Sequence, residues 1–355
     1  MFALALVASA LLGALEARGQ LSAPSFSDVP YYPGGSCAVP LSCSDAESEQ
    51  CLDVYLPASR STGRPTVLVI HGGGWTGGSK NAPEYLAFCA RLSALGYPVV
   101  SCNYTLACPD RPSYPQPIRD VRAALAWVRG PGQRPPYSLG PCVVAVGFSA
   151  GAHLAAMLGV LGDESEPSFL PVGAYPPAVP GRGLAPELVI AVSGPLDLYR
   201  FGREGAMAPA GSCPCFVGFL PGYPQSIIGF ATETFLGCTW TAGCNALPCA
   251  PQSVRPDDPC LQPNQLTGNP FVDASPVHWI SPADPPFFLL YTRCDPIVPG
   301  AASRWMKTAL ESAGVPVQER DLGYCGHAFT LFDDGRQAAD AVEEALRSVP
   351  VVPCR

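Results

Sequence analysis

The segment Gly147-Phe148-Ser149-Ala150-Gly151 has the residue types of a turn that presents a nucleophilic serine. It follows the apolar run Cys142 to Val146 and leads into Ala152 to Leu158, which is the order strand, tight turn, helix. Side chains two positions before and after the serine would clash in so sharp a turn, so glycine is needed at both. We therefore predict that Ser149 attacks a substrate carbon. The alternative is a strand-to-helix turn with an incidental serine.

A run of glycines precedes that serine in the chain. His71-Gly72-Gly73-Gly74-Trp75 closes the predicted strand Pro65 to Ile70. Consecutive glycines allow several backbone N–H groups to point at one spot, and with the Ala150 N–H they would surround a tetrahedral oxyanion. Losing one such donor typically costs about 3 kcal/mol of transition-state stabilisation. We predict an oxyanion hole here, the alternative being a flexible turn.

A serine hydroxyl needs a base, and the chain has four histidines, His71, His153, His278 and His327. The first belongs to the glycine turn. The second lies one helical turn after the serine, where its ring would pack beside the turn, and the third precedes a predicted strand. His327 follows the extended segment Pro316 to Leu322, at the carboxyl edge where sites of open α/β sheets collect. We predict that His327 is the general base, against the alternative of a surface histidine.

The acid that orients the histidine should also follow a strand. The apolar run that starts at Phe287 leads through Cys294 into Asp295. Its task would be to hold the imidazole tautomer and to stabilise the imidazolium. The alternative is an aspartate that caps a turn. The competitor is Asp197, and less favoured aspartates are Asp321, Asp333 and Asp334.

The order glycine turn, serine, aspartate, histidine resembles that of the α/β-hydrolase fold. The motifs HGGGW and GFSAGAH resemble its hormone-sensitive-lipase-like esterase branch. Three further motifs are similar to the BD-FAE group of secreted esterases, which is related to acetylxylan and feruloyl esterases: LDVYLP at 52–57, DASP at 273–276 and DPIVP at 295–299. The resemblance runs from about residue 52 to 347, with a gap at a cysteine-rich stretch.

The resemblance implies that Ser149, Asp295 and His327 form a catalytic triad. It also implies that Gly73, Gly74 and Ala150 supply the oxyanion hole. One departure is Thr105, which stands where the family commonly has arginine.

The remaining apolar patterns indicate elements that would position these residues. Continuous apolar runs, typical of strands buried on both faces, lie at 66–70, 97–102, 142–146, 188–192 and 287–291. Residues 51–57 alternate like a half-exposed strand. Helical periodicity occurs at 118–128, 301–313 and 338–349. We predict an α/β-hydrolase fold with a mostly parallel central sheet flanked by helices.

The stretch 199–270 lacks these apolar runs and helical periodicity, and it contains six cysteines. A structureless loop of that length is implausible in a compact domain, so we predict an inserted cap or lid subdomain stapled by disulfides. Its aromatic residues would line the acyl pocket or form its own core; they are Phe216, Phe219, Phe230, Phe235 and Trp240. The predicted organisation is a signal peptide at 1–19, a Cys- and Pro-rich segment at 20–50, a catalytic domain at 51–198 and 271–355, and this insertion.

Residues 1–14 are almost wholly apolar, and Ala17-Arg18-Gly19 offers a cleavage site, so we predict export, the alternative being an uncleaved anchor. No later stretch is long enough to span a membrane. The sixteen cysteines of an exported chain would form disulfides. Cys294 and Cys325 flank the predicted acid and base, and we predict that they pair, the alternative being free buried thiols.

Composition excludes other classes of protein. Charged residues make up only 14% and AVILMFWYC 48%, which excludes a charge-rich disordered chain and a coiled coil. The formal charge is −8 with only two lysines, so no basic stripe can bind nucleic acid. The lack of a CxxC pair argues against zinc. The sequon at Asn103 follows an apolar run, which leaves glycosylation open.

The prediction is a secreted serine carboxylic ester hydrolase that works through an acyl-enzyme and needs no metal or organic cofactor. Its partner would be a small-molecule or polysaccharide-linked ester. The alternatives are an amidase or formamidase acting on a small aromatic substrate, and a catalytically silent binding protein on a hydrolase scaffold.

Overall fold

A computed structural model describes most of the predicted catalytic domain. The described residues are 23–35, 37, 50–59, 63–108, 110–162, 167–175, 184–200, 231–232, 235–236, 266–323, 325–332 and 334–348. The predicted signal peptide and most of the predicted insertion lie outside them, as do Phe216, Phe219, Phe230 and Trp240.

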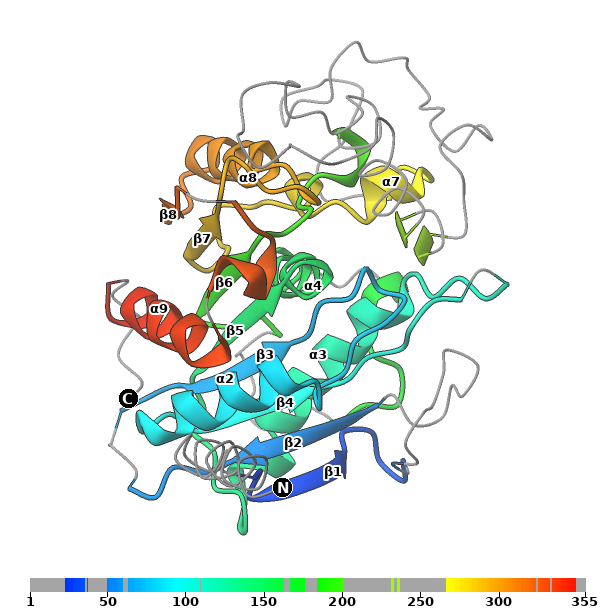
Figure 1. Cartoon of the computed structure of the whole chain (residues 1–355). Coiled ribbons are helices and arrows are strands. Elements are labelled where there is room, and N and C mark those ends of the chain that lie inside the picture. Colours follow the sequence, from blue (N-terminus) through cyan, green and yellow to red (C-terminus); the bar gives the residue numbers. More distant parts are fainter. Residues whose placement is uncertain are drawn as a thin grey trace, which may run out of the picture.

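Within the described residues, eight strands form one sheet in the order β1-β2-β4-β3-β5-β6-β7-β8 (Figure 1). Their bounds are β1 Phe26–Pro30, β2 Cys51–Tyr55, β3 Thr66–Ile70, β4 Val99–Cys102, β5 Val143–Phe148, β6 Leu188–Val192, β7 Phe287–Tyr291 and β8 Val317–Asp321. From β4 to β8 all neighbours are parallel, while β2 is antiparallel to both β1 and β4. The predicted mostly parallel sheet is confirmed, and β1 is additional to the predicted strands.

Helices lie between these strands. They are α2 Pro83–Ala94, α3 Gln116–Val128, α4 Ala150–Val160, α7 Pro270–Asp273, α8 Ala301–Ser312 and α9 Gly335–Ser348, with short 3₁₀ turns η1 Pro131–Gln133, η2 Pro167–Phe169, η5 Pro276–His278 and η6 Ala328–Leu331. The three helices predicted from periodicity are α3, α8 and α9. At the end of α8, Gly314 takes a φ of +77°, the left-handed conformation that glycine adopts at helix ends.

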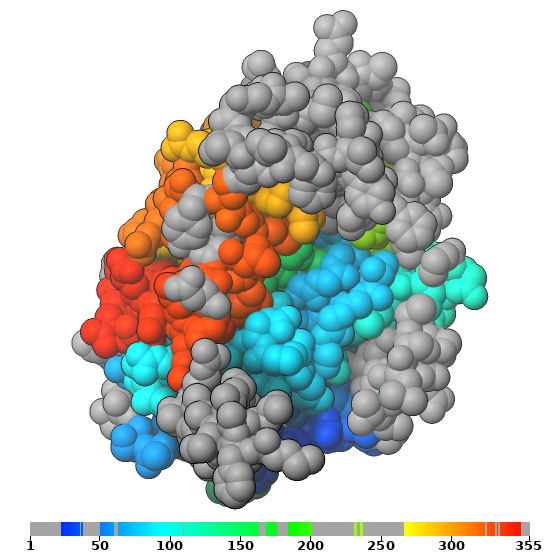
Figure 2. Space-filling view, in the orientation of Figure 1, coloured from blue at the N-terminus to red at the C-terminus, as the bar shows by residue number. Residues whose placement is uncertain are grey.

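The helices cover both faces of the sheet. Apolar side chains of α3, α4 and α8 pack with one face, as Leu125, Leu154 and Met306 do. Those of α2 and α9 pack with the other, as Phe88 and Val342 do. Figure 2 shows α2 in cyan and α9 in red on the same side of the molecule. Both faces of the central strands are therefore buried, which is why these strands read as unbroken apolar runs.

The prediction that residues 51–57 form a half-exposed strand is wrong. All five residues of β2 are buried. Strand β1 covers its outer edge, and Leu52 and Tyr55 contribute to opposite core faces. The intervening Asp53, whose polarity produced the alternating pattern, is buried in an ion pair with Lys80 at 2.7 Å.

Cysteine pairing follows the prediction only in part. Cys37 and Cys51 form a disulfide, which ties the N-terminal segment to β2. Cys108, Cys142, Cys294 and Cys325 are also disulfide-bonded, and the pairing of Cys294 with Cys325 remains a prediction. Cys89 and Cys102 are free, contrary to the expectation of full pairing. Cys102 packs in the core on one face of the sheet and Cys89 in the core on the other face.

Two further expectations concern single features. Asn103 is buried, and its amide oxygen accepts a hydrogen bond from the Lys80 N–H at 2.7 Å, which leaves little access for a glycan in the folded protein. None of the helices within the described ranges has the length and apolar character needed to cross a membrane.

Candidate active site

Ser149 lies at the turn between β5 and α4. Its backbone has a φ of 55° and a ψ of −121°, an uncommon conformation for a residue with a side chain. The backbone crowds both flanking glycines: a Cβ on Gly147 would lie 2.0 Å from the Gly151 carbonyl oxygen, and one on Gly151 would lie 2.2 Å from that of Ile70. The chain therefore requires glycine at both positions, as the sequence predicts.

The structure brings His327 to this serine. The Nε2 atom of His327 lies 2.8 Å from Ser149 Oγ, although the two residues are 178 positions apart. On the other side of the ring, Nδ1 lies 2.8 Å from Asp295 Oδ2 and 3.1 Å from Oδ1. An ionised carboxylate can only accept, so Nδ1 donates to Asp295, and Nε2 is left to accept the serine proton.

Asp295 is itself held in place. Its Oδ1 accepts hydrogen bonds from the backbone N–H groups of Ile297 and Val298, each at 2.8 Å. Asp295 is 3% exposed and Ser149 7%, whereas the His327 side chain is 11% exposed. A buried carboxylate, a ring and a buried hydroxyl thus form one line, of which the histidine side chain is the most exposed member.

The glycine turn lies against the serine. A Cβ on Gly72 would lie 3.2 Å from Ser149 Cβ. Gly73 and Gly74 have φ values of +117° and +61°. Among the described residues, none accepts a hydrogen bond from the backbone N–H of Gly73, Gly74 or Ala150. Unpaired N–H groups beside a helix N-terminus can bind an oxyanion.

The other histidines have structural contacts. His71 is buried, its Nδ1 lies 2.7 Å from the Gly72 carbonyl, and its ring stacks on Tyr104 at 4.2 Å. His153 is buried, with Nε2 2.6 Å from the Ala274 carbonyl. Burial lowers the pKa of both His71 and His153 to about 4, so each is neutral near pH 7. His278 lies in η5 and is also buried.

The competing aspartates take part in other contacts. Asp197 accepts a hydrogen bond from the Arg200 N–H, and Asp321 pairs with Arg293 at 2.6 Å. Asp334 accepts hydrogen bonds from two backbone N–H groups at the start of α9. Asp333 lies outside the described residues. Of these aspartates, those that the structure describes make no contact with His327.

Two short described pieces of the predicted insertion, 231–232 and 235–236, pack on the glycine turn. The Phe235 ring stacks on Trp75 with centroids 4.7 Å apart and meets His153 edge to face at 5.9 Å. The Ala231 methyl lies 3.1 Å from where a Cβ on Gly74 would be. Phe235 is fully buried, with its ring held between Trp75 and His153.

Sequence reasoning missed an ion cluster centred on the buried Lys80, which follows the glycine turn in the chain. The Lys80 ammonium lies 2.7 Å from both Asp28 and Asp53, and Lys80 is only 1% exposed. A lysine shortly after a glycine run in a chain with only two lysines was the available signal. The cluster connects β1 and β2 to the segment that ends the turn.

A second buried carboxylate lies near the position where the family commonly has arginine. Asp120 is fully buried and accepts a hydrogen bond from the Thr105 N–H at 2.8 Å. The amides of Gln50 and Gln116 donate to it at 2.9 and 2.8 Å. Burial raises the pKa of Asp120, and these hydrogen bonds oppose the rise. Neutral donors therefore satisfy this carboxylate.

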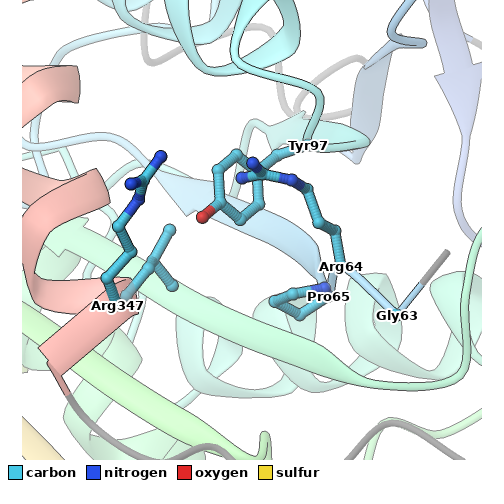
Figure 3. Close-up of a pocket in the computed structure, with 6 residues that line it drawn as sticks. Gly63, Arg64, Pro65, Tyr97 and Arg347 are labelled. Carbon is cyan, nitrogen blue, oxygen red and sulfur yellow. The ribbon is translucent and has the colours of Figure 1, made fainter. Parts of the chain in front are cut away.

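One pocket lies at the opposite edge of the sheet. Figure 3 shows the Arg64 side chain against the Tyr97 ring, with its guanidinium carbon 4.2 Å from the ring centroid. Arg64 and Tyr97 precede β3 and β4, whereas Ser149 follows the carboxyl end of β5. The pocket therefore holds none of the predicted site. Within the described parts of the chain, no group of metal-ligating side chains is placed to hold a metal ion.

Comparison with known proteins finds esterases among the similar sequences. The family model BD-FAE matches residues 52–212. Esterase LipQ of Mycobacterium tuberculosis is 28% identical over 90% of this chain, and the probable carboxylic ester hydrolase LipM of the same organism is 29% identical over 80%. The chain spans 61% and 54% of the lengths of these two relatives.

Solved structures share the fold. A truncated carbohydrate esterase from gut microbiota superimposes with a TM-score of 0.62, at 19% identity, over 93% of this chain and 98% of that one. The parallel sheet with helices on both faces, the serine turn and the match to the family model lead to one conclusion. The chain has the α/β-hydrolase fold, and its residues 52–212 are similar to the BD-FAE family.

Proposed function

We propose that this protein is a serine carboxylic ester hydrolase that forms an acyl-enzyme on Ser149. The observation that carries the proposal is the continuous line Asp295, His327, Ser149, with 2.8 Å on each side of the imidazole. Both distances are within the reach needed for proton transfer between a nucleophile, a base and an orienting acid. The named esterase relatives support the same reaction class.

In the proposed reaction, Ser149 Oγ attacks the ester carbonyl carbon while His327 Nε2 takes the hydroxyl proton. The carbonyl π electrons move to the oxygen, which the N–H groups of Gly73, Gly74 and Ala150 stabilise. Collapse of this intermediate breaks the bond to the alkoxy oxygen, and His327 returns the proton to the leaving alcohol. Water then repeats the sequence on the acyl-enzyme and releases the acid.

The acyl side of the substrate would face away from His327, because the histidine must reach the leaving alcohol. We propose that Ala231 and Phe235 of the insertion form the wall on that side. Their contacts with Gly74 and Trp75 support this, since these residues adjoin the proposed oxyanion hole. The carbohydrate esterase among the structural neighbours suggests a polysaccharide-linked ester as one substrate to test.

We further propose that the protein is secreted. The apolar N-terminal run and the disulfides that involve Cys37, Cys51, Cys108, Cys142, Cys294 and Cys325 support this, because such bonds persist in oxidising compartments. Expression in a eukaryotic secretory host tests it. The mature chain should appear in the medium with its N-terminus near Gln20, and retention in the cytosol would contradict the proposal.

The test of the chemistry is labelling with an organophosphonate. The wild type should incorporate one equivalent on Ser149, and Ser149→Ala should incorporate none. An unlabelled wild type would support the silent binding protein instead. Comparison of kcat/KM on acetyl, butyryl, long-chain and feruloyl esters and on matched amides then separates an esterase from an amidase.

A further inference from the structure

Two consecutive residues at the carboxyl end of β6 accept hydrogen bonds from the Ser149 backbone and from the residue after His327. The Val192 carbonyl accepts a hydrogen bond from the Ser149 N–H at 2.8 Å. Ser193 Oγ accepts one from the N–H of Ala328, the residue after His327, at 3.2 Å. One strand end thus holds the backbone of the proposed nucleophile and that of the proposed base.

Ser193 is well fixed for such a role. It is 2% exposed, and its own N–H donates to the Leu290 carbonyl of β7 at 2.9 Å. Strand β7 is the strand that leads to Asp295. The hydrogen bonds of Val192 and Ser193 therefore connect the end of β6 to the end of β5 and to β7.

The backbone conformations on both sides of this hydrogen bond are unusual. Ser149, Ser193 and Ala328 have φ values of 55°, 53° and 50°. For a residue with a Cβ this region costs about 1–2 kcal/mol, and it persists where neighbouring contacts enforce it. Ala328 has no polar side chain, and its backbone N–H donates to the Ser193 hydroxyl oxygen.

A second contact holds the same loop from the apolar side. The Phe329 ring stacks on Phe148, the residue before Ser149, with centroids 4.1 Å apart and planes 15° from parallel. Stacked rings can slide over each other at little cost, whereas a hydrogen bond fixes direction. The His327 backbone is also held locally, since its N–H donates to Thr330 Oγ1 at 2.6 Å and its carbonyl accepts from the Thr330 N–H at 2.9 Å. Ser193 supplies the hydrogen bond that connects the peptide after His327 to the end of β6.

From these contacts we infer that Ser193 is a positioning residue for the general base. It sets the backbone beside His327 so that Nε2 stays within reach of Ser149 Oγ in acylation and of water in deacylation. This inference rests on the proposed esterase function. Ser193 contacts neither substrate nor reacting atoms, so its effect must pass through His327.

The test is Ser193→Ala, which removes the acceptor but keeps the Cβ and hence the backbone strain. We expect kcat on p-nitrophenyl acetate to fall about ten- to a hundredfold with little change in KM, because a misplaced base slows chemistry. The pre-steady-state burst should slow by a similar factor, since His327 serves both half-reactions.

Two controls separate this effect from a loss of stability. Ser275→Ala removes another buried hydroxyl, one that accepts from the Leu198 N–H at 2.8 Å, and should lower Tm without lowering kcat. Ser193→Gly removes the acceptor and also relieves the strain at positive φ, so it should keep Tm and still lose kcat.

The outcomes are distinguishable from failure of the proposed function. If the wild type is labelled by the phosphonate and Ser193→Ala or Ser193→Gly retains wild-type kcat, the inference is overturned and the esterase proposal stands. If the loss of stability measured by Tm accounts for the whole fall in kcat, the residue is merely structural and the inference also fails. A wild type that hydrolyses no ester would reject both.

Discussion

His327 Nε2 lies 2.8 Å from Ser149 Oγ, and two adjacent residues at the end of β6 hold the backbone of this pair. Val192 accepts a hydrogen bond from the Ser149 N–H, and Ser193 accepts one from the N–H of Ala328, the residue after His327. The end of strand β6 therefore holds the backbone on both sides of the reactive pair. A site built on strand ends is more precise than one built on loops. The expected consequences concern the chemistry, the backbone of the turn, the buried charges and the substrate.

Asp295→Asn should reduce kcat by about four orders of magnitude, because an amide that donates to Nδ1 favours the wrong imidazole tautomer. The measurement is kcat on p-nitrophenyl acetate. The matched control is Asp321→Asn, which breaks an exposed pair with Arg293 and should leave kcat unchanged. Equal activity of the two variants would remove Asp295 from the proposed mechanism.

Gly151→Ala should destabilise the fold by about 3 kcal/mol or more, because the new Cβ would overlap backbone that cannot move aside. Gly140→Ala is the control, since its Cβ would lie 3.8 Å from the closest atom. Urea unfolding of both variants measures the difference. A Gly151→Ala protein as stable as the control would show that the turn can relax.

Lys80→Met should cost about 3–5 kcal/mol in the free energy of unfolding, because it leaves Asp53 buried without its counter-charge. Arg91→Met removes a partner of the exposed Arg91–Asp340 pair and should cost at most about 1 kcal/mol. Chemical denaturation compares the two. Similar losses in both would mean that the buried cluster contributes no more than a surface pair.

Acid should destabilise the fold through His71 and His153. Burial lowers the pKa of each from 6.5 to about 4, so between these values the unfolded chain binds protons that the folded chain does not. The contribution of each histidine to the free energy of unfolding is therefore fully present above the unfolded pKa. As the pH is lowered between the two pKa values, this contribution falls by about 1.4 kcal/mol per pH unit for each group, and it levels off below the folded pKa. Asp120, whose pKa burial raises, acts in the opposite direction.

The contribution of one histidine can be isolated with His153→Gln, which keeps a donor for the Ala274 carbonyl but does not titrate. The loss of unfolding free energy between about pH 7 and about pH 5 should be smaller in the variant than in the wild type. Identical pH dependence in both proteins would mean that His153 titrates normally in the folded state.

Phe235→Ala should open space beside Trp75 and raise the kcat/KM of butyryl over acetyl esters by about tenfold, the range expected for extra methylenes in an apolar pocket. Phe88→Leu, on the other face of the sheet, is the control and should leave the ratio unchanged. An unaltered ratio in Phe235→Ala would place the acyl group elsewhere.

Apolar patterning was enough to predict the central strands, and glycine spacing was enough to predict the serine turn. Strands β3, β6 and β7 have the predicted bounds because burial on both faces leaves an unbroken apolar signal, and Gly147 and Gly151 follow from the crowding of the turn. His327 and Asp295 could be selected because parallel strands deliver their carboxyl ends to one edge.

Other features depend on contacts between segments that are far apart in the chain. That β2 is buried depends on β1 covering its edge, and the neutralisation of Asp53 depends on a lysine 27 positions away. The contact between Ser193 and Ala328 spans 135 positions and involves a hydroxyl and a backbone N–H, groups that occur throughout the chain. Such contacts carry no periodic or compositional signal, because they arise from where strand ends meet in space.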